Sequence, residues 1–320
     1  MTTLSQKQGV AVLGIYVADL AFRAPAMPGL GQTIAGNGFA MGPGGKGSNQ
    51  AVAAARVGAA VRFISAIGKD SFGDFALSLW RQESIAPHVR VIDGAPTGAA
   101  FIYVNDASGD NAIIVVPGAA SQLSSQDVQR EHQAIATARV FVTQLEQPPE
   151  AALAGLQIAR AAGTTTVFNP APALDFPPQI YGLCDFITPN EHEAALLTGI
   201  AIDSVEDARR AADVLLERGV GCALITLGAQ GSLLHSRSQS LHLPALCAGS
   251  VVETAGAGDA FNGAFAAGLA EGMTAEQAAR LATAVAAISV TRAGTAPSMP
   301  SRQEALALLQ ANSGALAQAQ

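Results

Sequence analysis

The chain is poor in aromatic and charged residues and has few cysteines. Aromatic residues make up 5% and charged residues 13% of its 320 residues, whereas hydrophobic residues make up 49%. Intrinsic disorder needs the opposite balance, because a chain with little apolar surface cannot offset the entropy that it loses on folding. We therefore expect a folded protein with a large buried core.

The sequence also lacks a cluster of lysine and arginine and any long apolar run. Its net charge is −7, and no stretch offers the basic surface that follows a phosphate backbone. No run reaches the length of about 18 apolar residues that a membrane span requires. The apolar start is interrupted by Asp19 and has no small-residue cleavage pattern, which predicts a first strand rather than a signal peptide. We expect no nucleic-acid or membrane partner.

The three cysteines, Cys184, Cys222 and Cys247, are far apart and form no CxxC pair. No histidine lies near them at the spacing of a metal site. An odd number of scattered cysteines is typical of reduced thiols, which indicates a cytoplasmic protein.

Apolar runs with strand character alternate with alanine-rich helical runs along most of the chain. Strands are predicted at 10–17, 61–66, 140–144, 165–169, 185–188 and 223–227, and helices at 49–57, 72–82, 149–161, 191–197 and 205–217. This order predicts an α/β fold with a doubly wound, mostly parallel sheet and helices on both faces. Helices are also expected at 258–271, 274–291 and 301–311, followed by a frayed tail over 313–320.

Two segments do not fit this alternation. The segment 32–41 is short and glycine-rich, and 98–116 is typical of a hairpin with its turn at 106–110. Together they predict a small antiparallel β-sheet. We expect a single domain over 1–320, with lid segments inserted at about 18–42 and 97–117, because a flap over the ligand edge of the main sheet is suited to close on a substrate.

The stretch Gly256-Ala257-Gly258 precedes Asp259 at the start of a predicted helix. Small residues there expose consecutive N–H groups, and the helix dipole adds positive charge, which favours an anion or an oxyanion that forms in a transition state. Asp259 is placed to accept a proton from a substrate hydroxyl. The alternative is that this carboxylate only caps the helix.

A second glycine-rich segment, from Gly42 to Asn49, precedes another predicted helix. It matches the GxGxxG pattern of dinucleotide-binding folds, but it does not follow a first parallel strand, and no acidic residue ends the next strand. It is not a Walker A loop either, because Ala40 stands where glycine is required. A turn that holds a hydroxyl-rich ligand through N–H groups, Lys46 and Asn49 agrees better with this context.

The segments GGKGSNQAVAAARVG and ETAGAGDAFNGA resemble the two signatures of the PfkB carbohydrate kinase family. Further segments at 144–146, 169–173, 188–193, 225–231 and 290–298 follow in the order and spacing of the ribokinases of that family. The resemblance covers about Val10 to Ser301. It implies a ribokinase-like fold, and transfer of the γ-phosphoryl group of Mg-ATP to the primary 5-hydroxyl of a pentose such as D-ribose.

The resemblance also implies a role for each matching residue. Asp259 is the expected catalytic base, beside an anion hole of Gly256, Ala257 and Gly258. The sugar is expected at Asp19, Gly45, Lys46, Gly47, Asn49 and Glu146. ATP is expected at Asn190, Thr226, Leu227, Gly228, Gly231, Gly258 and Thr283, with Mg²⁺ near Glu193. A monovalent cation, usually K⁺, is expected at Glu253, Ala255, Ser289, Arg292, Gly294 and Ser298.

Three positions depart from the ribokinase pattern. Val17 stands two residues before Asp19, where an asparagine is usual. Valine leaves a buried sugar hydroxyl unpaired at a cost of about 1–3 kcal/mol, which favours 2-deoxyribose or another pentose, unless Val17 is only strand core. Glu253 stands where aspartate is usual, so a weaker or shifted response to K⁺ is expected. Thr283 replaces a histidine that is frequent near the adenine.

Structural explanations exist for several of these residues taken singly. Glu146 can be a solvated loop residue, Asn190 and Glu193 can form a capping box, and Arg292 can complement a helix dipole.

The expected partners are a sugar, ATP and a second copy of the chain. The second copy is expected to pair through the apolar face of the lid, which includes Phe101 and Tyr103. A kinase for 2-deoxyribose, another sugar or a nucleoside is the nearest alternative function. A dinucleotide-dependent oxidoreductase and a non-catalytic sugar-binding protein are alternatives of other classes.

Overall fold

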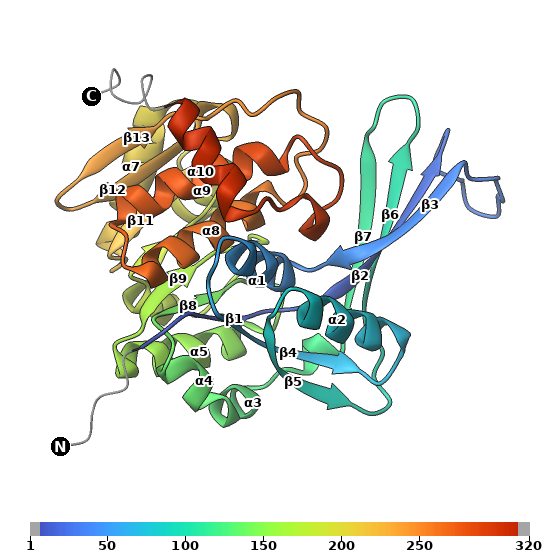
Figure 1. Ribbon diagram of the computed structural model, residues 1–320, viewed down its shortest axis with the longest axis horizontal. Coiled ribbons are helices and arrows are strands. Elements are labelled where there is room, and N and C mark those ends of the chain that lie inside the picture. The colour runs from blue at the N-terminus through green and yellow to red at the C-terminus, as the bar shows by residue number, and fades with distance from the viewer. Residues whose placement is uncertain (1–6, 313–320) are drawn as a thin grey trace.

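The computed structural model describes residues 7–312, so the tail that was expected to fray lies outside the described residues. The described strands form two sheets, one of nine strands in the order β13-β12-β11-β10-β9-β8-β1-β4-β5 and one of four in the order β3-β2-β6-β7. Figure 1 shows the four-stranded sheet standing to one side of the layered body.

The main sheet is parallel over most of its width. Its parallel strands are β1 (Val10–Leu13), β4 (Val61–Gly68), β5 (Ala86–Ile92), β8 (Val140–Thr143), β9 (Thr165–Phe168), β10 (Phe186–Ile187) and β11 (Cys222–Thr226). Two strands at one edge, β12 (Ser232–Ser236) and β13 (Ser240–Leu243), are antiparallel. Strands β1 and β8 are buried along their whole length, as expected where helices cover both faces.

The helices divide into two layers. The chain forms α1 (Lys46–Arg56), α2 (Ser71–Gln82), α3 (Ser125–Arg130), α4 (His132–Ala136), α5 (Pro149–Ala162), α6 (Glu191–Thr198), α7 (Val205–Glu217), α8 (Ala257–Glu271), α9 (Ala275–Ser289) and α10 (Arg302–Ala311), with short 3-10 turns at 119–122, 178–183, 228–230 and 296–298. Val10 and Val12 of β1 enter the core beneath α1, α8 and α9, whereas Ala11 and Leu13 enter the core above α5 and α7. The predicted doubly wound sheet, with helices on both faces, is confirmed.

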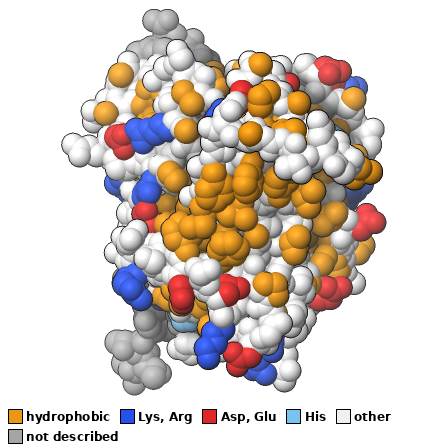
Figure 2. Space-filling view, turned by 90° about the vertical axis from the view of Figure 1, so that its right-hand side faces the viewer, with side chains coloured by type: hydrophobic (Ala, Val, Ile, Leu, Met, Phe, Trp, Pro, Cys, Tyr) orange, Lys and Arg blue, Asp and Glu red, His pale blue; other side chains and the backbone are white. Residues whose placement is uncertain are grey.

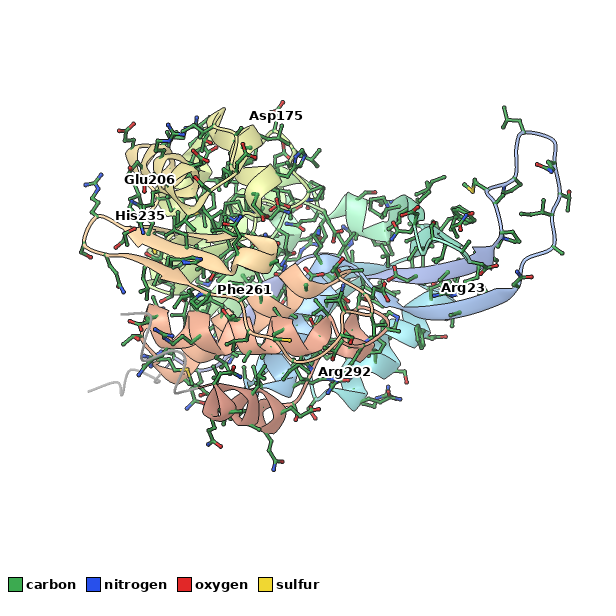
Figure 3. All side chains as sticks on the ribbon, turned by 90° about the horizontal axis from the view of Figure 1, so that it is seen from above. Arg23, Asp175, Glu206, His235, Phe261 and Arg292 are labelled. Atoms are coloured by element: carbon green, nitrogen blue, oxygen red, sulfur yellow. The ribbon has the colours of Figure 1, made fainter. Side chains whose placement is uncertain are left out.

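The four-stranded sheet, called the small sheet below, consists of β2 (Val17–Ala24), β3 (Gly38–Gly44), β6 (Thr97–Asn105) and β7 (Asn111–Gly118). The prediction of an antiparallel sheet is wrong for its central pair, because β2 and β6 run parallel. Both strands follow parallel strands of the main sheet, β1 and β5, and therefore leave the body in the same direction. Seen from above, the part of the small sheet that carries Arg23 extends away from the body, in which Phe261 lies (Figure 3).

Two predicted boundaries around the small sheet are also wrong. The single strand expected at 10–17 divides at residues 14–16, where the chain passes from the main sheet to the small sheet. The turn expected over Gly42 to Asn49 is instead the end of β3, which reaches Gly44, and the first turn of α1, which begins at Lys46. The N–H group of Ser48 donates to the Ile15 carbonyl at 3.1 Å, so the first turn of α1 is held against the corner between the sheets.

None of the helices within residues 7–312 combines the length and the apolar character that a membrane-spanning segment needs.

Candidate active site

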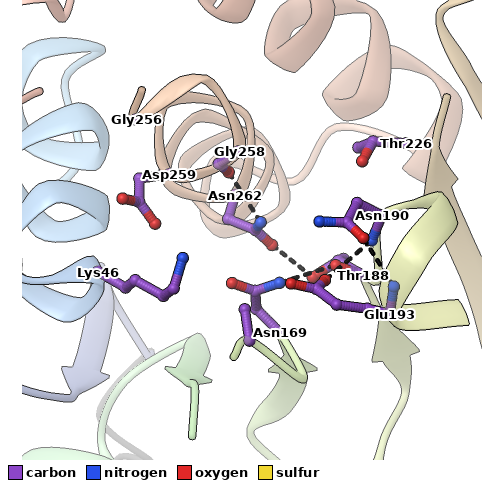
Figure 4. A pocket seen from close by; sticks show the side chains of 11 residues that line it. Lys46, Asn169, Thr188, Asn190, Glu193, Thr226, Gly256, Gly258, Asp259 and Asn262 are labelled. Carbon is purple, nitrogen blue, oxygen red and sulfur yellow. Dashed lines mark hydrogen bonds between the residues drawn. The ribbon is translucent and has the colours of Figure 1, made fainter. Parts of the chain in front are cut away.

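A pocket of about 150 Å³ lies where the carboxyl ends of the central strands face the N-terminus of α8. This edge is where ligands bind in open α/β sheets. Its lining consists of Lys46, Asn169, Ala171, Thr188, Asn190, Glu193, Thr226, Gly256, Gly258, Asp259 and Asn262. Seven of these residues were among the predicted site residues, and Figure 4 shows their side chains converging from α1, α6, α8 and the strand ends.

The N-terminus of α8 forms one wall of the pocket. Gly256 precedes the helix with a φ angle of 80°, a left-handed conformation that suits glycine. The N–H group of Ala257 donates to the Thr254 carbonyl, but the N–H groups of Gly258 and Asp259 have no acceptor within residues 7–312. These free donors and the positive end of a 15-residue helix make this wall suitable for an anion.

The Asp259 carboxylate lies beside these donors and is only 6% exposed. Asn49 donates to its Oδ2 at 3.1 Å, and Gln50 donates to its Oδ1 at 3.0 Å. Burial raises the pKa of Asp259, while the Lys46 ammonium and the two amide hydrogen bonds oppose that rise. Asp259 is therefore held by side chains of α1, and it does not cap its own helix with a side-chain hydrogen bond.

Lys46 begins α1, and its ammonium points into the pocket near Asp259 (Figure 4). Burial acts to lower the pKa of Lys46, but the carboxylates of Asp259, Glu146 and Glu193 turn the net shift upward. The main-chain N–H of Lys46 donates to Glu146 Oε2 at 2.7 Å, so Glu146 is not a free loop residue. Burial raises the pKa of Glu146 to about 7, despite the opposing attraction of Lys46.

Asp19 lies on β2 of the small sheet, near the carboxylates of Asp259 and Glu146. Gly44 of β3 leaves room for it, since a Cβ atom at Gly44 would lie 2.1 Å from Asp19 Oδ1. Burial, with added repulsion from Glu253 and Asp259, raises the pKa of Asp19 to about 7. The corner between the two sheets thus gathers acidic side chains that were predicted from positions far apart in the sequence.

The predicted nucleotide residues lie on the other side of the pocket. Asn190 and Glu193 form the capping box of α6, with the Glu193 N–H donating to Asn190 Oδ1 at 2.8 Å, yet both side chains also line the pocket. Thr226 at the end of β11 lines it as well. Leu227, Gly228 and Gly231 follow in the next turn, outside the lining. Thr283 lies on α9, where its hydroxyl donates to the Ala279 carbonyl.

The residues expected to hold a monovalent cation lie in the loop before α8 and in the segment from Ser289, the last residue of α9, to Ser298. Glu253 Oε2 accepts a hydrogen bond from the Gly294 N–H at 2.8 Å, which joins the two loops. The hydroxyls of Ser289 and Ser298 donate to nearby carbonyls, and the Arg292 side chain pairs with Glu304 rather than facing the site. Ala255 precedes Gly256 in the first loop. Within residues 7–312, no cluster of three or more His, Cys, Asp or Glu side chains forms a metal site.

Four buried polar residues of the site were missing from the predicted set. Gln50 contacts Asp259, and Asn169, Thr188 and Asn262 line the pocket. Thr188 Oγ1 donates to Asn262 Oδ1 at 2.5 Å, and Asn262 Nδ2 donates to the Gly258 carbonyl at 2.9 Å. Their position directly after strands, or inside the two glycine-rich motifs, was the signal that could have identified them.

The GxGxxG segment does not have the position in the fold that a dinucleotide site needs. It spans the end of β3 of the small sheet and the start of α1, and does not follow the first strand of the parallel sheet. The oxidoreductase alternative therefore has no support from the fold.

Comparisons with known proteins agree with this site. The family description "pfkB family carbohydrate kinase" matches residues 7–302. A ribokinase of Haemophilus influenzae is 39% identical over 305 residues, covering 95% of this chain and 99% of that protein. A deoxyribokinase of Salmonella typhi is 35% identical over 297 residues, covering 92% and 96%. The structure of Arabidopsis thaliana ribokinase complexed with ribose and ATP superposes with a TM-score of 0.88 at 28% identity, covering 95% and 99%. The chain belongs to the PfkB family of carbohydrate kinases and is a sugar kinase.

Proposed function

We propose that this kinase transfers the γ-phosphoryl group of ATP to the primary 5-hydroxyl of a pentose. The observation that supports this most is the buried Asp259 carboxylate, which lies beside the unpaired N–H groups that start α8. A base and an anion site in contact are what phosphoryl transfer to an alcohol requires. Relatives named ribokinase and deoxyribokinase make a pentose the acceptor to test first.

The chemistry at Asp259 is a single proton transfer coupled to displacement at phosphorus. The sugar hydroxyl gives its proton to the Asp259 carboxylate, its oxygen bonds to the γ-phosphorus, and the bond from that phosphorus to the bridging oxygen breaks, releasing ADP. The N–H groups of Gly258 and Asp259 and the Lys46 ammonium stabilise the charge on the transferred group.

The sugar site that we propose lies between α1 and the small sheet. Asn49 Oδ1 is buried without a hydrogen-bond donor, and is thus an acceptor available to a sugar hydroxyl. Asp19 and Glu146 add carboxylate oxygens, and the start of α1 at Gly45, Lys46 and Gly47 adds main-chain groups. A group of acceptors close to Asp259 agrees with a polyhydroxylated ligand.

The nucleotide is proposed to lie along Asn190, Thr226 and the turn from Leu227 to Gly231, with its phosphates directed at Gly256, Ala257 and Gly258. Mg²⁺ bound with ATP would neutralise phosphate charge. We propose that Glu193 is the carboxylate that would hold it through water; the side chain lines the pocket, while Oε2 accepts from the Asn190 N–H.

A monovalent cation such as K⁺ is proposed behind the anion site. Carbonyl oxygens of Ala255, Ser289, Arg292 and Gly294, the Ser298 hydroxyl and the Glu253 carboxylate form an oxygen-rich donor set of low charge, which agrees with such an ion. The hydrogen bond between Glu253 and Gly294 already joins the two loops that would surround it. The cation would stabilise the loop that leads into Gly256.

We also propose that residues 1–320 form one domain in which the segments at about 18–42 and 97–117 act as a lid. The outer face of the small sheet exposes a continuous apolar surface (Figure 2), which includes Phe22, Phe39, Met41 and Ile114. Phe101 packs against Phe22, whereas Tyr103 is only 8% exposed. Pairing of this surface with a second copy would cover it.

Val17 favours 2-deoxyribose over ribose as the pentose acceptor. Its side chain is 3% exposed and packs with Ile15 and Ala100, two residues before Asp19 on the same strand. An apolar side chain beside the proposed sugar site offers no partner to one more hydroxyl.

A coupled ADP-release assay tests both the reaction and the acceptor. We expect release that depends on a pentose, with kcat/KM for 2-deoxyribose above that for ribose. The variant Val17→Asn should shift the ratio toward ribose, whereas Val17→Ala, which removes bulk without adding an amide, should not. A large preference of the unmodified protein for ribose would defeat the deoxyribose candidate. No ADP release with any pentose would defeat the proposed reaction.

A further inference from the structure

Two buried glutamines lie behind Asp259. Gln50 on α1 and Gln144 after β8 are both fully buried. Gln144 Nε2 donates to Gln50 Oε1 at 2.6 Å, and Gln50 Nε2 donates to Asp259 Oδ1 at 3.0 Å. The same Gln50 nitrogen donates to Asn169 Oδ1 at 3.1 Å. Every polar atom of the Gln50 amide is therefore engaged.

The orientation of the Gln50 side-chain amide decides whether the Asp259 carboxylate faces an NH₂ group or a carbonyl oxygen. With Nε2 toward Asp259, the carboxylate receives two N–H donors. With the amide rotated by half a turn, a carbonyl oxygen would face the carboxylate, and two NH₂ groups would face each other at Gln144. The donor from Gln144 and the acceptor Asn169 Oδ1, whose own amide donates to the main-chain carbonyl of Thr188, therefore both favour the arrangement that stabilises ionised Asp259.

We infer that Gln50 is a positioning residue that aims the Asp259 carboxylate at the acceptor hydroxyl and keeps it ionised, and that Gln144 fixes the Gln50 amide for this task. The expected effect of this inference on turnover rests on the proposed function. The hydrogen bonds from which it is argued do not depend on that function. Neither glutamine lines the pocket or is among the residues proposed to hold the sugar or the nucleotide, so we expect loss of either side chain to act on turnover more than on substrate binding.

Other charges also act on Asp259. The Lys46 ammonium of α1 favours its ionised form, whereas Asp19 of β2, Glu146 of the loop after β8 and Glu193 of α6 repel it. Because burial disfavours the charged carboxylate, removal of the Gln50 donor adds to an existing bias toward protonation.

The test compares three near-isosteric variants, Gln50→Met, Gln144→Met and Gln147→Met. Gln147 is a matched control, because it is also buried and lies on the loop of Gln144, but it donates to Thr143 Oγ1 and the Gln144 carbonyl instead of reaching Asp259. Thermal unfolding of each variant separates loss of fold from loss of positioning.

We expect Gln50→Met to lower kcat about ten- to a hundredfold and to change the sugar KM by less than about threefold. The acidic limb of its kcat–pH profile should move up by about one pH unit. Gln144→Met should change the same quantities less, and Gln147→Met should leave them unchanged. A rise in the sugar KM without a fall in kcat, or an equal effect of Gln147→Met, contradicts the inference.

A measurement without turnover separates this inference from the proposed function. The carboxyl carbon of Asp259, assigned through Asp259→Asn, is titrated by ¹³C NMR in the free protein. Gln50→Met should raise its midpoint, whether or not the protein phosphorylates a pentose. An unchanged midpoint together with an unchanged kcat overturns the inference alone. A raised midpoint in a protein that releases no ADP with any pentose leaves the inference standing and overturns the proposed function.

Discussion

The side-chain amide of Asn49 donates to Asp259 Oδ2 at 3.1 Å across 210 positions of sequence, while its own Oδ1 is buried without a donor. One side chain therefore contacts the proposed base and offers an acceptor to the proposed sugar. Asn49 and Gln50 are neighbours on α1 and share Asp259, but only Asn49 has an unused acceptor.

This difference predicts distinct kinetics for the two positions. Asn49→Leu should raise the sugar KM about tenfold or more and also lower kcat, because it removes one contact to the sugar and one to Asp259. Initial rates of ADP release over a range of pentose concentrations measure both constants. As a control, Asn312→Leu removes an amide that donates to the Leu308 carbonyl at the end of α10, and it should change neither constant. A normal KM in Asn49→Leu would remove Asn49 from the sugar site.

Asp19 gives a prediction about stability and pH. Its pKa in the folded protein, about 7, lies above the value of about 4 in an unfolded chain. Its contribution to stability is therefore fully present below about pH 4 and is lost as the pH rises to about 7. Asp19→Asn should raise the free energy of unfolding at pH 8 by about 1–4 kcal/mol, with no gain at pH 4.

Urea unfolding of the ligand-free protein at both pH values measures this effect. Asp93→Asn, at an exposed position, serves as the control and should give no gain at either pH. The same Asp19→Asn variant should bind the pentose weakly. A gain that is equal at pH 4 and pH 8 would show that the burial of charge at Asp19 is not its cause.

The hydrogen bond between Glu253 and Gly294 leads to a prediction about the stimulation of the reaction rate by K⁺. Its carboxylate is drawn toward the Gly294 N–H, and aspartate, which is shorter by one methylene, cannot make that contact from the same backbone position. We expect a weak stimulation by K⁺ in the unmodified protein and a stimulation about threefold or more larger in Glu253→Asp. Rates with K⁺ or tetramethylammonium at constant ionic strength measure it. Identical stimulation of both proteins would contradict the assigned cation site.

The apolar face of the small sheet predicts a dimer. Phe39 is 62% exposed, and its ring lies 5.0 Å from that of Phe22. Phe39→Asp should convert a dimer to a monomer in sedimentation equilibrium. Leu196→Asp is the matched control, because Leu196 is 61% exposed on α6, away from the small sheet, and its replacement should leave the dimer intact. An unmodified protein that sediments as a monomer would refute the proposed pairing.

The sequence predicts best those elements whose own residues specify them. Helix α7 matches its predicted bounds at 205–217, because its apolar positions recur at helical spacing and Ser204 caps it. Strands β12 and β13 were not predicted, since each is a short segment rich in serine and histidine, and they form an edge of the sheet through the pairing of β12 with β11 and of β13 with β12. Strand β5 is another edge strand, with mainly exposed side chains.

The same distinction holds at the site. Asp259 and the glycines before it could be predicted because consecutive residues form the helix start. Gln50 and Gln144 carry no charge and belong to no spacing pattern, and they meet only because α1 packs behind the end of β8, across 94 positions of sequence. The resemblance supplied the two cation loops, whereas the Glu253 contact to Gly294 needed the fold. The cytoplasmic location stays a prediction from the scattered cysteines.

The proposed reaction depends most on Asp259 as the base that takes the proton of the acceptor hydroxyl. The decisive measurement is pentose-dependent ADP release by the unmodified protein, by Asp259→Asn, and by Asp127→Asn, which alters an equally buried aspartate that pairs with Arg90 and Arg130 outside the site. We predict that Asp259→Asn lowers kcat about a thousandfold with a nearly unchanged sugar KM, and that Asp127→Asn keeps its kcat. Near-normal turnover by Asp259→Asn would contradict the central assignment.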